Sequence, residues 1–554
     1  MNINFFENYN VNVEFEIDKE NYGGELIIEK GFISRLEVKT GYNYLSNKEI
    51  PKKIVCKKKD NYGFLTLHDI SYDSGIFYFK FLTTGNDDIS EYRKIKIGLT
   101  GITTWFEACD PVELNNTELR KDVHLDEFSA DFVYEKEKYE IKNSRDIRFK
   151  EINKEKYVIE IEDFILIKSV VALTLDKIKD ISCRIMTLFS ILIGAGLSIT
   201  SIYLIDTNEK KKSISLFFDY GSYDKIPLRY AHHAFSNFHK INRKNIWESI
   251  LNNFFSKEIF KCVGGKLPYL MGGCFNTWEY EVFAVLAVFE RCCNLLSSSR
   301  SHKLKKKDFE SLKINILLNF DSYVKKNLEL DKNVICSIRE GIDGIKNTSV
   351  ISLGDKIKKT IATTPSEIRD IIRFDNDTFR LATKIRNAIA HGNAYDIKEN
   401  LNKEFVLKNK SMVFLMYFLF RELGIDDKFF VKSLSKSRNN FAEKADLDHR
   451  SMDKFSGLYD FIDIVGNVDN DINPEKYIFI VLNFINGDYY FNNSMTKCVF
   501  SDFRNSEILD VKDFVKEKID HKKYTVDYSV SPYITIKGEE KRWHGAVLIK
   551  ENKL

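Results

Sequence analysis

The stretch Arg386-Asn-Ala-Ile-Ala-His391-Gly-Asn393 ends a segment whose apolar residues recur at the spacing of an amphipathic helix. Gly392 and Asn393 are residue types that commonly stop helices, so the sequence predicts that this helix ends at His391. A helix with one apolar face needs other elements to cover that face. The residues expected on the buried face are Phe379, Ala382, Ile385 and Ile389.

The segments on both sides of this stretch also favour helices, so we expect an all-α bundle from residue 275 to 430. Apolar residues recur at helical spacing from 279 to 296 and from 405 to 423, where Gly424 predicts the end. A helix is expected from 309 to 328, and two shorter helices between 334 and 359. Ser366 is a candidate cap, and the helix that ends at His391 begins near Asn376.

Residues 1–260 are expected to form a β-rich N-terminal domain. Asn-Tyr-Gly, Asp-Ser-Gly and Thr-Gly-Asn turn signals separate short alternating runs in its first 160 residues. A long helix from residue 173, a strand from 197 to 205 and a helical stretch from 231 to 260 complete this part. The predicted strands are 11–17, 24–28, 64–67, 76–81 and 95–99.

The C-terminal part differs in composition from the bundle. Residues 431–472 are interpreted as a linker or helical segment, because 433–453 is rich in Lys, Ser, Asn and Asp. From 473 to 554 we expect a small α+β domain with a helix at 511–519. Its strands are expected at 477–484, 489–491, 524–536 and 543–549. The fold class is therefore predicted to be α+β and multidomain.

Bulk composition narrows the class of protein. Lys+Arg and Asp+Glu total 84 and 81, and a net charge of +3 excludes a strongly basic protein that binds nucleic acid over its whole surface. The nine cysteines are scattered without C-x-x-C spacing, which is typical of reduced thiols in a cytoplasmic protein. No motif for a cofactor or a metal ion is present in the sequence, so we expect neither.

The uncharged segment from Ile185 to Ile205 leaves two interpretations open. Its length is that of a membrane span. Gly194 and Gly196 interrupt it, however, and the residues that follow are rich in β-branched side chains. We favour a core helix, a glycine turn and a buried strand, and hence no membrane partner.

Arg386 and His391 are the residue types that metal-independent RNA cleavage requires. Histidine can take the proton of a 2′-hydroxyl or donate one to the leaving 5′-oxygen near neutral pH. The planar guanidinium of arginine keeps its charge and fits a phosphate group. The same two residues also suit a helix end on structural grounds, because both can bond the last carbonyls. A purely structural role therefore remains an alternative.

Helix geometry sets a condition on this site. Five residues along an ideal helix place Arg386 and His391 about 140° apart around the axis. The two side chains can converge if the helix ends at His391, or if two subunits share the site. We expect both, because a twofold dimer would also supply two histidines, one for each proton transfer.

The motif and its surroundings resemble the HEPN superfamily of ribonucleases. Arg386-Asn-Ala-Ile-Ala-His391 is similar to the R-x4-6-H signature of those domains, and the segment Phe283 to Glu290 resembles their first helix. Phe414 to Gly424 resembles their closing helix. In the N-terminal half, the segment Leu99 to Phe106 and the region around Gly194 resemble the N-terminal domain of ApeA-type anti-phage proteins. The resemblance covers about residues 1 to 430.

The resemblance implies a bacterial anti-phage ribonuclease that causes abortive infection by cutting RNA, with tRNA as the expected target. It implies that Arg386 and His391 are the catalytic pair, that Asn387 orients them, and that Glu290 positions Arg386 or the substrate. It also implies a homodimer with a composite active site and a phage-derived trigger. Residues 474 to 554 match nothing in this plan, and their role stays open.

Two alternatives to the nuclease remain. One is a HEPN domain that binds nucleotides, RNA or protein without cutting, and the other is a partner of a nucleotidyl- or AMP-transferring toxin. The lysine-rich run His302–Lys307 could contact phosphates but is more typical of a solvated helix start. Trp105 and Trp278 could stack on a base, although core packing is favoured for both.

Overall fold

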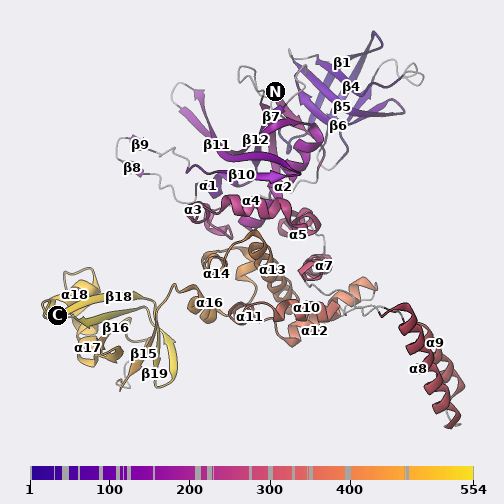
Figure 1. Cartoon of the computed structure of the whole chain (residues 1–554). Helices are drawn as coiled ribbons and strands as arrows, with labels where there is room; N and C mark the ends of the chain where they lie inside the picture. The colour runs from indigo at the N-terminus through magenta and orange to yellow at the C-terminus, as the bar shows by residue number, and fades with distance from the viewer. Residues whose placement is uncertain are drawn as a thin grey trace.

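The structure is a computed structural model of the whole chain, in which three regions follow one another (Figure 1). A β-rich N-terminal region precedes a helical region and a C-terminal sheet, which confirms the mixed α+β class in this coarse form. The residues described are 3–29, 32–39, 49–59, 63–85, 92–107, 113–115, 118–120, 126–153, 156–205, 214–220, 228, 230–273, 277–296, 304–326, 331–345, 347, 353–392, 401–466, 468 and 473–552.

Strands β1 to β6 close into a small barrel at the N-terminal end. They follow the order β6-β3-β2-β1-β4-β5, and β5 also pairs with β6, which closes the ring. In β1 the side chains of Val13, Phe15 and Ile17 are buried, whereas Glu14 and Glu16 are exposed, as alternation along a strand requires. The bounds are β1 (Tyr9–Ile17), β2 (Glu20–Ile28), β3 (Arg35–Val38), β4 (Lys53–Lys58), β5 (Phe64–Asp73) and β6 (Ile76–Thr84).

A second group of strands continues this sheet in the order β10-β11-β12-β7-β13-β14, and the short pairing of β14 with β6 joins it to the barrel. β11 and β12 form a long antiparallel ribbon. β8 and β9 form a separate two-stranded pair. The bounds are β7 (Tyr92–Leu99), β8 (Glu113–Asn115), β9 (Glu118–Arg120), β10 (Ser129–Tyr134), β11 (Glu137–Asn153), β12 (Lys156–Leu173), β13 (Ile199–Ile205) and β14 (Ile214–Phe217).

The expected helix, glycine turn and strand are present between residues 175 and 205. Helix α2 (Leu175–Ile193) ends at Gly194, whose φ of 71° lies in the left-handed region that glycine favours. Strand β13 follows, and both elements are buried. Among the helices that the structure describes, none combines the length and apolar character that a bilayer crossing requires.

Helices α1 and α3 to α6 cover the N-terminal sheet around an aromatic core. The helical stretch expected at 231–260 is interrupted by non-helical residues at 234–237, 244–246 and 257. Trp105 is fully buried and its indole nitrogen donates a 2.7 Å hydrogen bond to the carbonyl of Ser236. The bounds are α1 (Ile102–Phe106), η2 (Ala231–His233), α3 (Phe238–Arg243), α4 (Trp247–Ser256), α5 (Glu258–Val263), η3 (Gly264–Lys266) and α6 (Leu267–Gly272).

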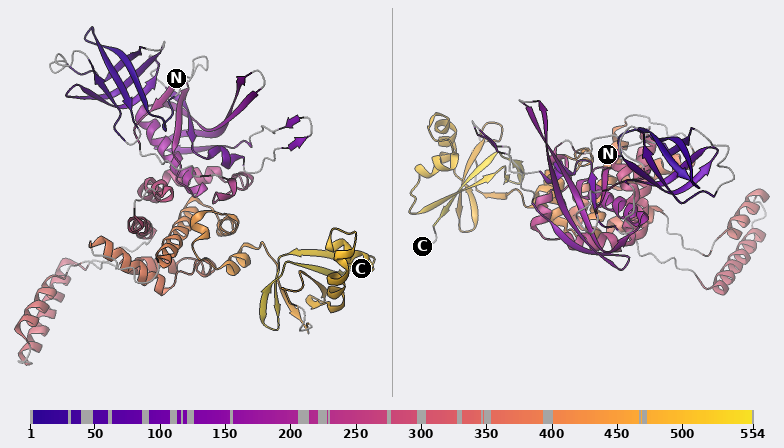
Figure 2. Two further views of the ribbon diagram at one scale, coloured as in Figure 1. Left: turned by 180° about the vertical axis from the view of Figure 1, so that it is seen from behind. Right: turned by 90° about the horizontal axis from the view of Figure 1, so that it is seen from above.

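The helical region is built around α13, which is buried along most of its length and ends at Gly424 as expected. Helices α7, α11, α12, α14 and α15 contact it. Helices α8 and α9 instead form an arm that stands away from the rest of the chain in all views (Figure 2). The bounds are α7 (Trp278–Leu296), α8 (Lys306–Lys326), α9 (Lys332–Asp343), α10 (Leu353–Ala362), α11 (Ser366–Ile372), α12 (Asn376–Ala390), α13 (Asn402–Leu423), α14 (Asp427–Lys436), α15 (Asn440–Glu443) and α16 (His449–Ser456).

One local expectation in this region is wrong. Ser366 does not cap α11, because it is the first helical residue and its hydroxyl bonds the side chain of Glu367. Of the two interpretations of 431–472, linker or helical segment, the helical one fits 433–453, which contributes to helices α14 to α16 and buries Leu434, Asn439 and Met452. Two of its polar residues cap short helices: Asn439 and Asp448 each accept a backbone N–H.

The C-terminal sheet has the order β18-β21-β16-β17-β15-β19-β20 and is covered by α17 and α18 on one face. Strand β15 lies upstream of residue 473, so the sheet begins earlier than the sequence predicts. The strands expected at 477–484, 489–491 and 543–549 and the helix at 511–519 are present, whereas the strand expected at 524–536 is divided into two at Ser531, whose φ is 51°. Helix α17 and strand β20 are additional elements. The bounds are β15 (Phe461–Val465), β16 (Phe479–Ile485), β17 (Asp488–Phe491), α17 (Asn493–Asp502), η4 (Phe503–Asn505), α18 (Val511–Glu517), β18 (Tyr524–Val530), β19 (Tyr533–Ile536), β20 (Glu539–Arg542) and β21 (Gly545–Glu551).

Helix α16 joins this sheet to the helical region. The hydroxyl of Tyr533 donates a 2.7 Å hydrogen bond to Asp453, and burial raises the pKa of Tyr533 to about 12. Arg450 makes a two-pronged ion pair with Glu540. These contacts fix the β19–β20 edge of the sheet against α16.

Replacing Trp105 with alanine should lower the free energy of unfolding by about 3–5 kcal/mol, because a large buried ring and its hydrogen bond are both lost. Urea unfolding followed by circular dichroism measures this change. Tyr280→Ala, whose ring is 63% exposed, is the control and should change stability little. A loss below about 1 kcal/mol for Trp105→Ala would contradict the core role.

Candidate functional site

Helix α12 begins and ends where the sequence predicts. The Asp375 side chain accepts a 2.7 Å hydrogen bond from the backbone N–H of Thr378 at its start. Ala390 is the last helical residue, and His391 is the C-cap, whose N–H still bonds the carbonyl of Asn387 at 3.1 Å. Gly392 follows with a φ of 69°, which turns the chain away from the helix axis. Asn393 lies outside the described residues.

One face of α12 is buried against α7 and α13. Ala382 and Ile385 are buried, while Phe379 and Ile389 are partly buried and pack at the edges of the core. The residues of α7 and α13 that contact this face are Val282, Leu286 and Leu407. The predicted apolar face is therefore confirmed, and it fixes the rotation of α12 about its axis.

The opposite face of α12 carries a polar stripe, which we define as Arg380, Lys384, Asn387 and His391. These residues are spaced at i, i+4, i+7 and i+11, which keeps them within about 60° of one another around the helix. All four are exposed. Two of them are permanently cationic, so the stripe presents positive charge beside the imidazole of His391.

Arg386 lies off the stripe and turns toward α7. Its Nε is 3.5 Å from Oε2 of Glu290, and its Nη1 donates a 3.3 Å hydrogen bond to Oδ1 of Asn387. Three of the four candidate residues are thus in contact: Arg386, Asn387 and Glu290. The side chain of His391 makes no hydrogen bond with these three described residues, although its backbone N–H bonds the carbonyl of Asn387. Within one chain, Asn387 therefore connects the guanidinium of Arg386 to the stripe.

A small hollow lies beside Arg386, between α7, α10 and α12. Glu290 and Arg386 line it together with Thr383 and apolar side chains. The ammonium of Lys358 on α10 lies 4.8 Å from the centre of the Phe379 ring, which adds a second cation close to this hollow. No sequence pattern indicated that Lys358 lies near this site, because α10 approaches α12 only in the folded chain. The apolar lining is Leu286, Phe289, Ile357, Phe374, Phe379 and Ala382.

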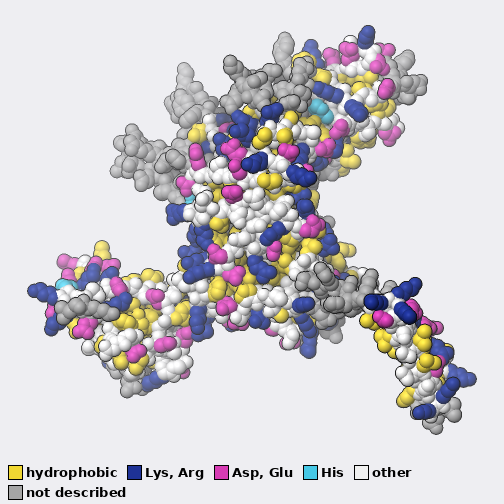
Figure 3. Space-filling model, in the orientation of Figure 1, with side chains coloured by type: hydrophobic (Ala, Val, Ile, Leu, Met, Phe, Trp, Pro, Cys, Tyr) yellow, Lys and Arg dark blue, Asp and Glu magenta, His cyan; other side chains and the backbone are white. Residues whose placement is uncertain are grey.

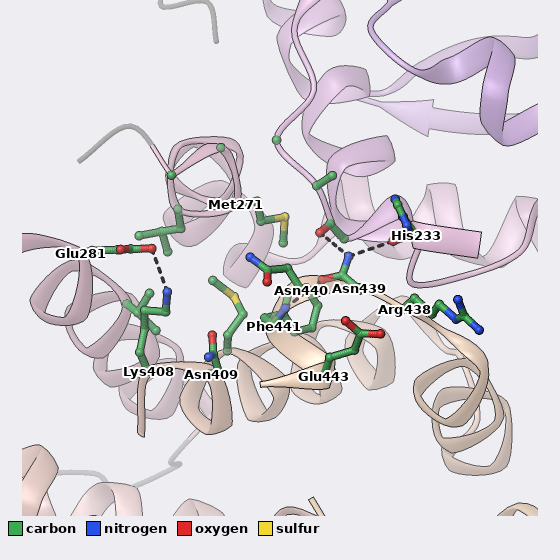
Figure 4. A pocket seen from close by; sticks show the side chains of 18 residues that line it. His233, Met271, Glu281, Lys408, Asn409, Arg438, Asn439, Asn440, Phe441 and Glu443 are labelled. Atoms are coloured by element: carbon green, nitrogen blue, oxygen red, sulfur yellow. Dashed lines mark hydrogen bonds and ion pairs between the residues drawn. The ribbon is translucent and has the colours of Figure 1, made fainter. Parts of the chain in front are cut away.

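A larger cavity of about 720 Å³ separates the N-terminal and helical regions (Figure 4). Glycine backbone at 194, 196, 272 and 273 forms one wall, and the polar side chains come from α7, α13 and the segment 438–443. Lys408 and Glu281 form a 2.8 Å ion pair in this wall. The cavity is therefore lined by side chains of both positive and negative charge, and no sequence pattern predicted it.

Asn439 holds the two walls of this cavity together. Its side-chain amide donates hydrogen bonds to the carbonyls of Gly194 at 2.9 Å and His233 at 3.2 Å, both from the N-terminal region. The residue is 6% exposed, so these carbonyls would have few other partners. Asn439 therefore acts as a clamp between the N-terminal and helical regions.

The remaining candidates take structural positions. Trp105 belongs to the N-terminal core, and Trp278 packs against the cluster under α12. Lys305, Lys306 and Lys307 are exposed at the start of α8, whereas residues 302 and 303 lie outside the described part of the chain. Among the histidines, His239 bonds the carboxylate of Asp126.

Comparison with known proteins identifies no related site. No family model, no curated protein and no solved structure matches this chain.

Asn439→Ala should lower the free energy of unfolding by about 1–3 kcal/mol, because it removes the donor from the buried carbonyl of Gly194 and the partly buried carbonyl of His233. Asn440→Ala removes the exposed neighbouring amide and is the matched control, with an expected change within about 0.5 kcal/mol. Chemical denaturation of both variants measures the difference. Equal stabilities would show that the clamp contributes nothing.

Ile385→Ala should cost about 2–5 kcal/mol of stability, since the side chain is fully buried. Arg386→Ala and His391→Ala should each stay within about 1 kcal/mol, because the ion pair to Glu290 is partly exposed and His391 is at the surface. Thermal unfolding of the three variants measures this contrast on one helix. A large loss for Arg386→Ala would indicate a structural role for the motif.

Proposed function

We propose that the chain is an endoribonuclease of the HEPN type, in which Arg386 and His391 form the active site. The observation that carries this proposal is the end of α12. There an exposed histidine shares a face with Arg380 and Lys384, and Asn387 links that face to Arg386. A rigid helix carries all of these groups, which suits the precise positioning that catalysis needs.

The proposed reaction is transesterification at phosphorus. The imidazole of His391 accepts the proton of the ribose 2′-hydroxyl, and the oxygen attacks the adjacent phosphate. The guanidinium of Arg386 stabilises the added negative charge of the phosphorane. The bond to the 5′-oxygen then breaks, that oxygen takes up a proton, and a 2′,3′-cyclic phosphate remains on the other fragment.

Asn387 and Glu290 are positioning residues in this proposal. The hydrogen bond from Arg386 to Asn387 directs the guanidinium toward the stripe, and the ion pair to Glu290 holds it while no phosphate is bound. A separation of about 140° between Arg386 and His391 supports a site shared by two chains. In a twofold dimer each histidine would serve one of the two proton transfers.

The proposed biological role is abortive infection, with tRNA as the RNA cut in response to a phage-derived trigger. The role rests on the family resemblance and on the two regions that flank the helical region. The clamp at Asn439 and the adjoining cavity support a coupling between the N-terminal region and the nuclease.

A non-catalytic RNA- or protein-binding module is the second candidate. The observation that favours it is the ion pair between Arg386 and Glu290, since a carboxylate partner offsets the charge that a phosphorane would need. Release of Glu290 on substrate binding is therefore a requirement of the nuclease proposal.

Arg386→Ala and His391→Ala should each reduce RNA cleavage by about 10²–10⁴-fold, because they remove the cation or the proton carrier. The assay uses purified full-length protein with a tRNA pool and maps the ends that form. We expect 2′,3′-cyclic phosphate ends and no effect of a chelator. The same ends should appear in phage-infected cells that express the wild type.

Two variants on exposed helix positions serve as matched controls. Arg369→Ala removes an exposed arginine from α11, outside the polar stripe, and His449→Ala removes an exposed histidine from α16. Both should retain cleavage within about tenfold, since neither touches the reacting phosphate in this proposal. Intact RNA in every sample, with phage protection unchanged in both Arg386→Ala and His391→Ala, would reject the nuclease and leave the binding module.

A further inference from the structure

The cavity between the N-terminal and helical regions has the dimensions of a small-molecule site. Its volume of about 720 Å³ lies within the range of about 300–1,000 Å³ that is usual for such sites, which often lie where two domains meet. In its glycine wall the backbone of Gly196 packs directly on α6, since a Cβ there would lie 2.3 Å from the carbonyl oxygen of Pro268. The hydrogen bonds of Asn439 hold the two walls together, so the cavity is built into the fold.

One polar atom in the cavity wall is available to a ligand although its residue is almost completely buried. Asn409 is 3% exposed, and its amide nitrogen donates a 3.3 Å hydrogen bond to the carbonyl of Lys444. Among the described residues, none donates to its amide oxygen, which points from α13 toward the cavity (Figure 4). A buried acceptor lowers stability unless a donor reaches it. The cavity therefore offers this oxygen to a ligand N–H group.

The ion pair in the same wall presents both charges at one point. Nζ of Lys408 lies 2.8 Å from Oε1 of Glu281, and the two side chains are partly exposed. Each keeps further hydrogen-bonding capacity, because an ammonium has three N–H donors and a carboxylate has two oxygens. Asn440, at the start of α15, extends its amide toward the same space (Figure 4). A ligand in this part of the cavity meets a cation, a carboxylate and two amides.

The balance of charge disfavours a phosphate-rich ligand. Besides His233, the charged residues that line the cavity are Lys408, Arg438, Glu281 and Glu443. Where the N-terminal and helical regions meet, side chains of both signs are interleaved on the face drawn in Figure 3. Phosphate groups select concentrated positive charge, which this lining does not provide. A ligand with one positive and one negative group suits it better.

The spacing of the ion pair limits how far apart those two groups can be. Because Lys408 and Glu281 are in contact, a carboxylate beside the first and an ammonium beside the second must be close neighbours. An α-amino acid carries both groups on one carbon atom, whereas peptide units separate the free ends of a peptide. The apolar part of the lining suits an apolar side chain, because methionines adapt to the shape of a ligand. This part consists of Leu270, Met271, Val285, Met412 and Phe441.

We propose that the cavity binds a free α-amino acid with an apolar side chain. Glu281 and the amide oxygen of Asn409 accept hydrogen bonds from its ammonium, while Lys408 and Asn440 donate to its carboxylate. Its side chain lies against the methionines and Phe441. The ligand contacts both the glycine wall and the helical region, so its binding stabilises the contact between them. This proposal does not depend on the nuclease activity of α12.

The test is calorimetric titration of the purified full chain with L-leucine, L-methionine and L-phenylalanine. At least one should bind with a dissociation constant below about 1 mM and raise the unfolding temperature. The amide of the bound amino acid lacks the carboxylate, and its N-acetyl derivative lacks the ammonium. Each derivative should bind at least about tenfold more weakly, because one charged contact is lost. This comparison needs no change in the protein.

Two substitutions remove the charges from the cavity wall. Lys408→Gln and Glu281→Gln should each weaken binding at least about tenfold. The matched controls, Lys403→Gln and Glu279→Gln, change the same helices outside the cavity lining and should bind like the wild type. Circular dichroism checks that the variants are folded. If a variant unfolds, the comparison of the derivatives on the wild type still decides.

Three outcomes would overturn the proposal: no binding of any of the three amino acids at about 10 mM, equal binding of both derivatives, or unchanged binding in both folded variants. Binding of adenosine monophosphate or of leucyl-leucine, without binding of the free amino acids, would overturn it in favour of a nucleotide or a peptide site.

Discussion

The burial of α13 is the constraint on which the rest of the molecule depends. Between Met412 and Phe420 this helix is buried on every side, and a helix of this kind cannot face water. Helices α7, α12 and α14 cover it from the helical region, and α4 covers it from the N-terminal region. Asn253 and Lys257 donate to its last carbonyls, which completes the helix end from the N-terminal region. The two regions therefore share one core, and neither can move away without exposing α13.

Helix α12 lies at the edge of this core, which explains why one of its faces is buried and the other is exposed. Its inner face is held by α7 and α13, whereas the polar side chains of its outer face are exposed, so these side chains are carried on a fixed helix without being buried. The ion pair of Arg386 with Glu290 belongs to the boundary between the two faces. A partly exposed pair of this kind contributes little to stability, and a phosphate could replace the carboxylate at modest cost.

Helix ends and turns could be predicted from the sequence where a few neighbouring residues determine them. The end of α12 was predictable because Gly392 adopts a positive φ, and the turn at Gly194 was predictable for the same reason. For 433–453 the sequence left a linker and a helical segment open, because Asn, Ser and Asp residues are typical of exposed chain, although Asn439 and Asp448 cap helices here and Ser433 is buried. The cavity is lined by residues from 194 to 443, and Lys358 contacts Phe379 across two helices. Contacts between residues so far apart in the chain produce no pattern of sequence spacing, so they could not be predicted.

The closure of β1 to β6 has a consequence for recognition. A strand at the edge of an open sheet offers unpaired backbone groups to any extended peptide, which is how many domains capture a partner strand and also how sheets aggregate. From Leu65 to His68, β5 pairs with both β4 and β6, so its backbone groups are taken on both sides. A partner strand therefore cannot join the ring along this stretch, and a molecule that contacts β5 there can do so only through side chains.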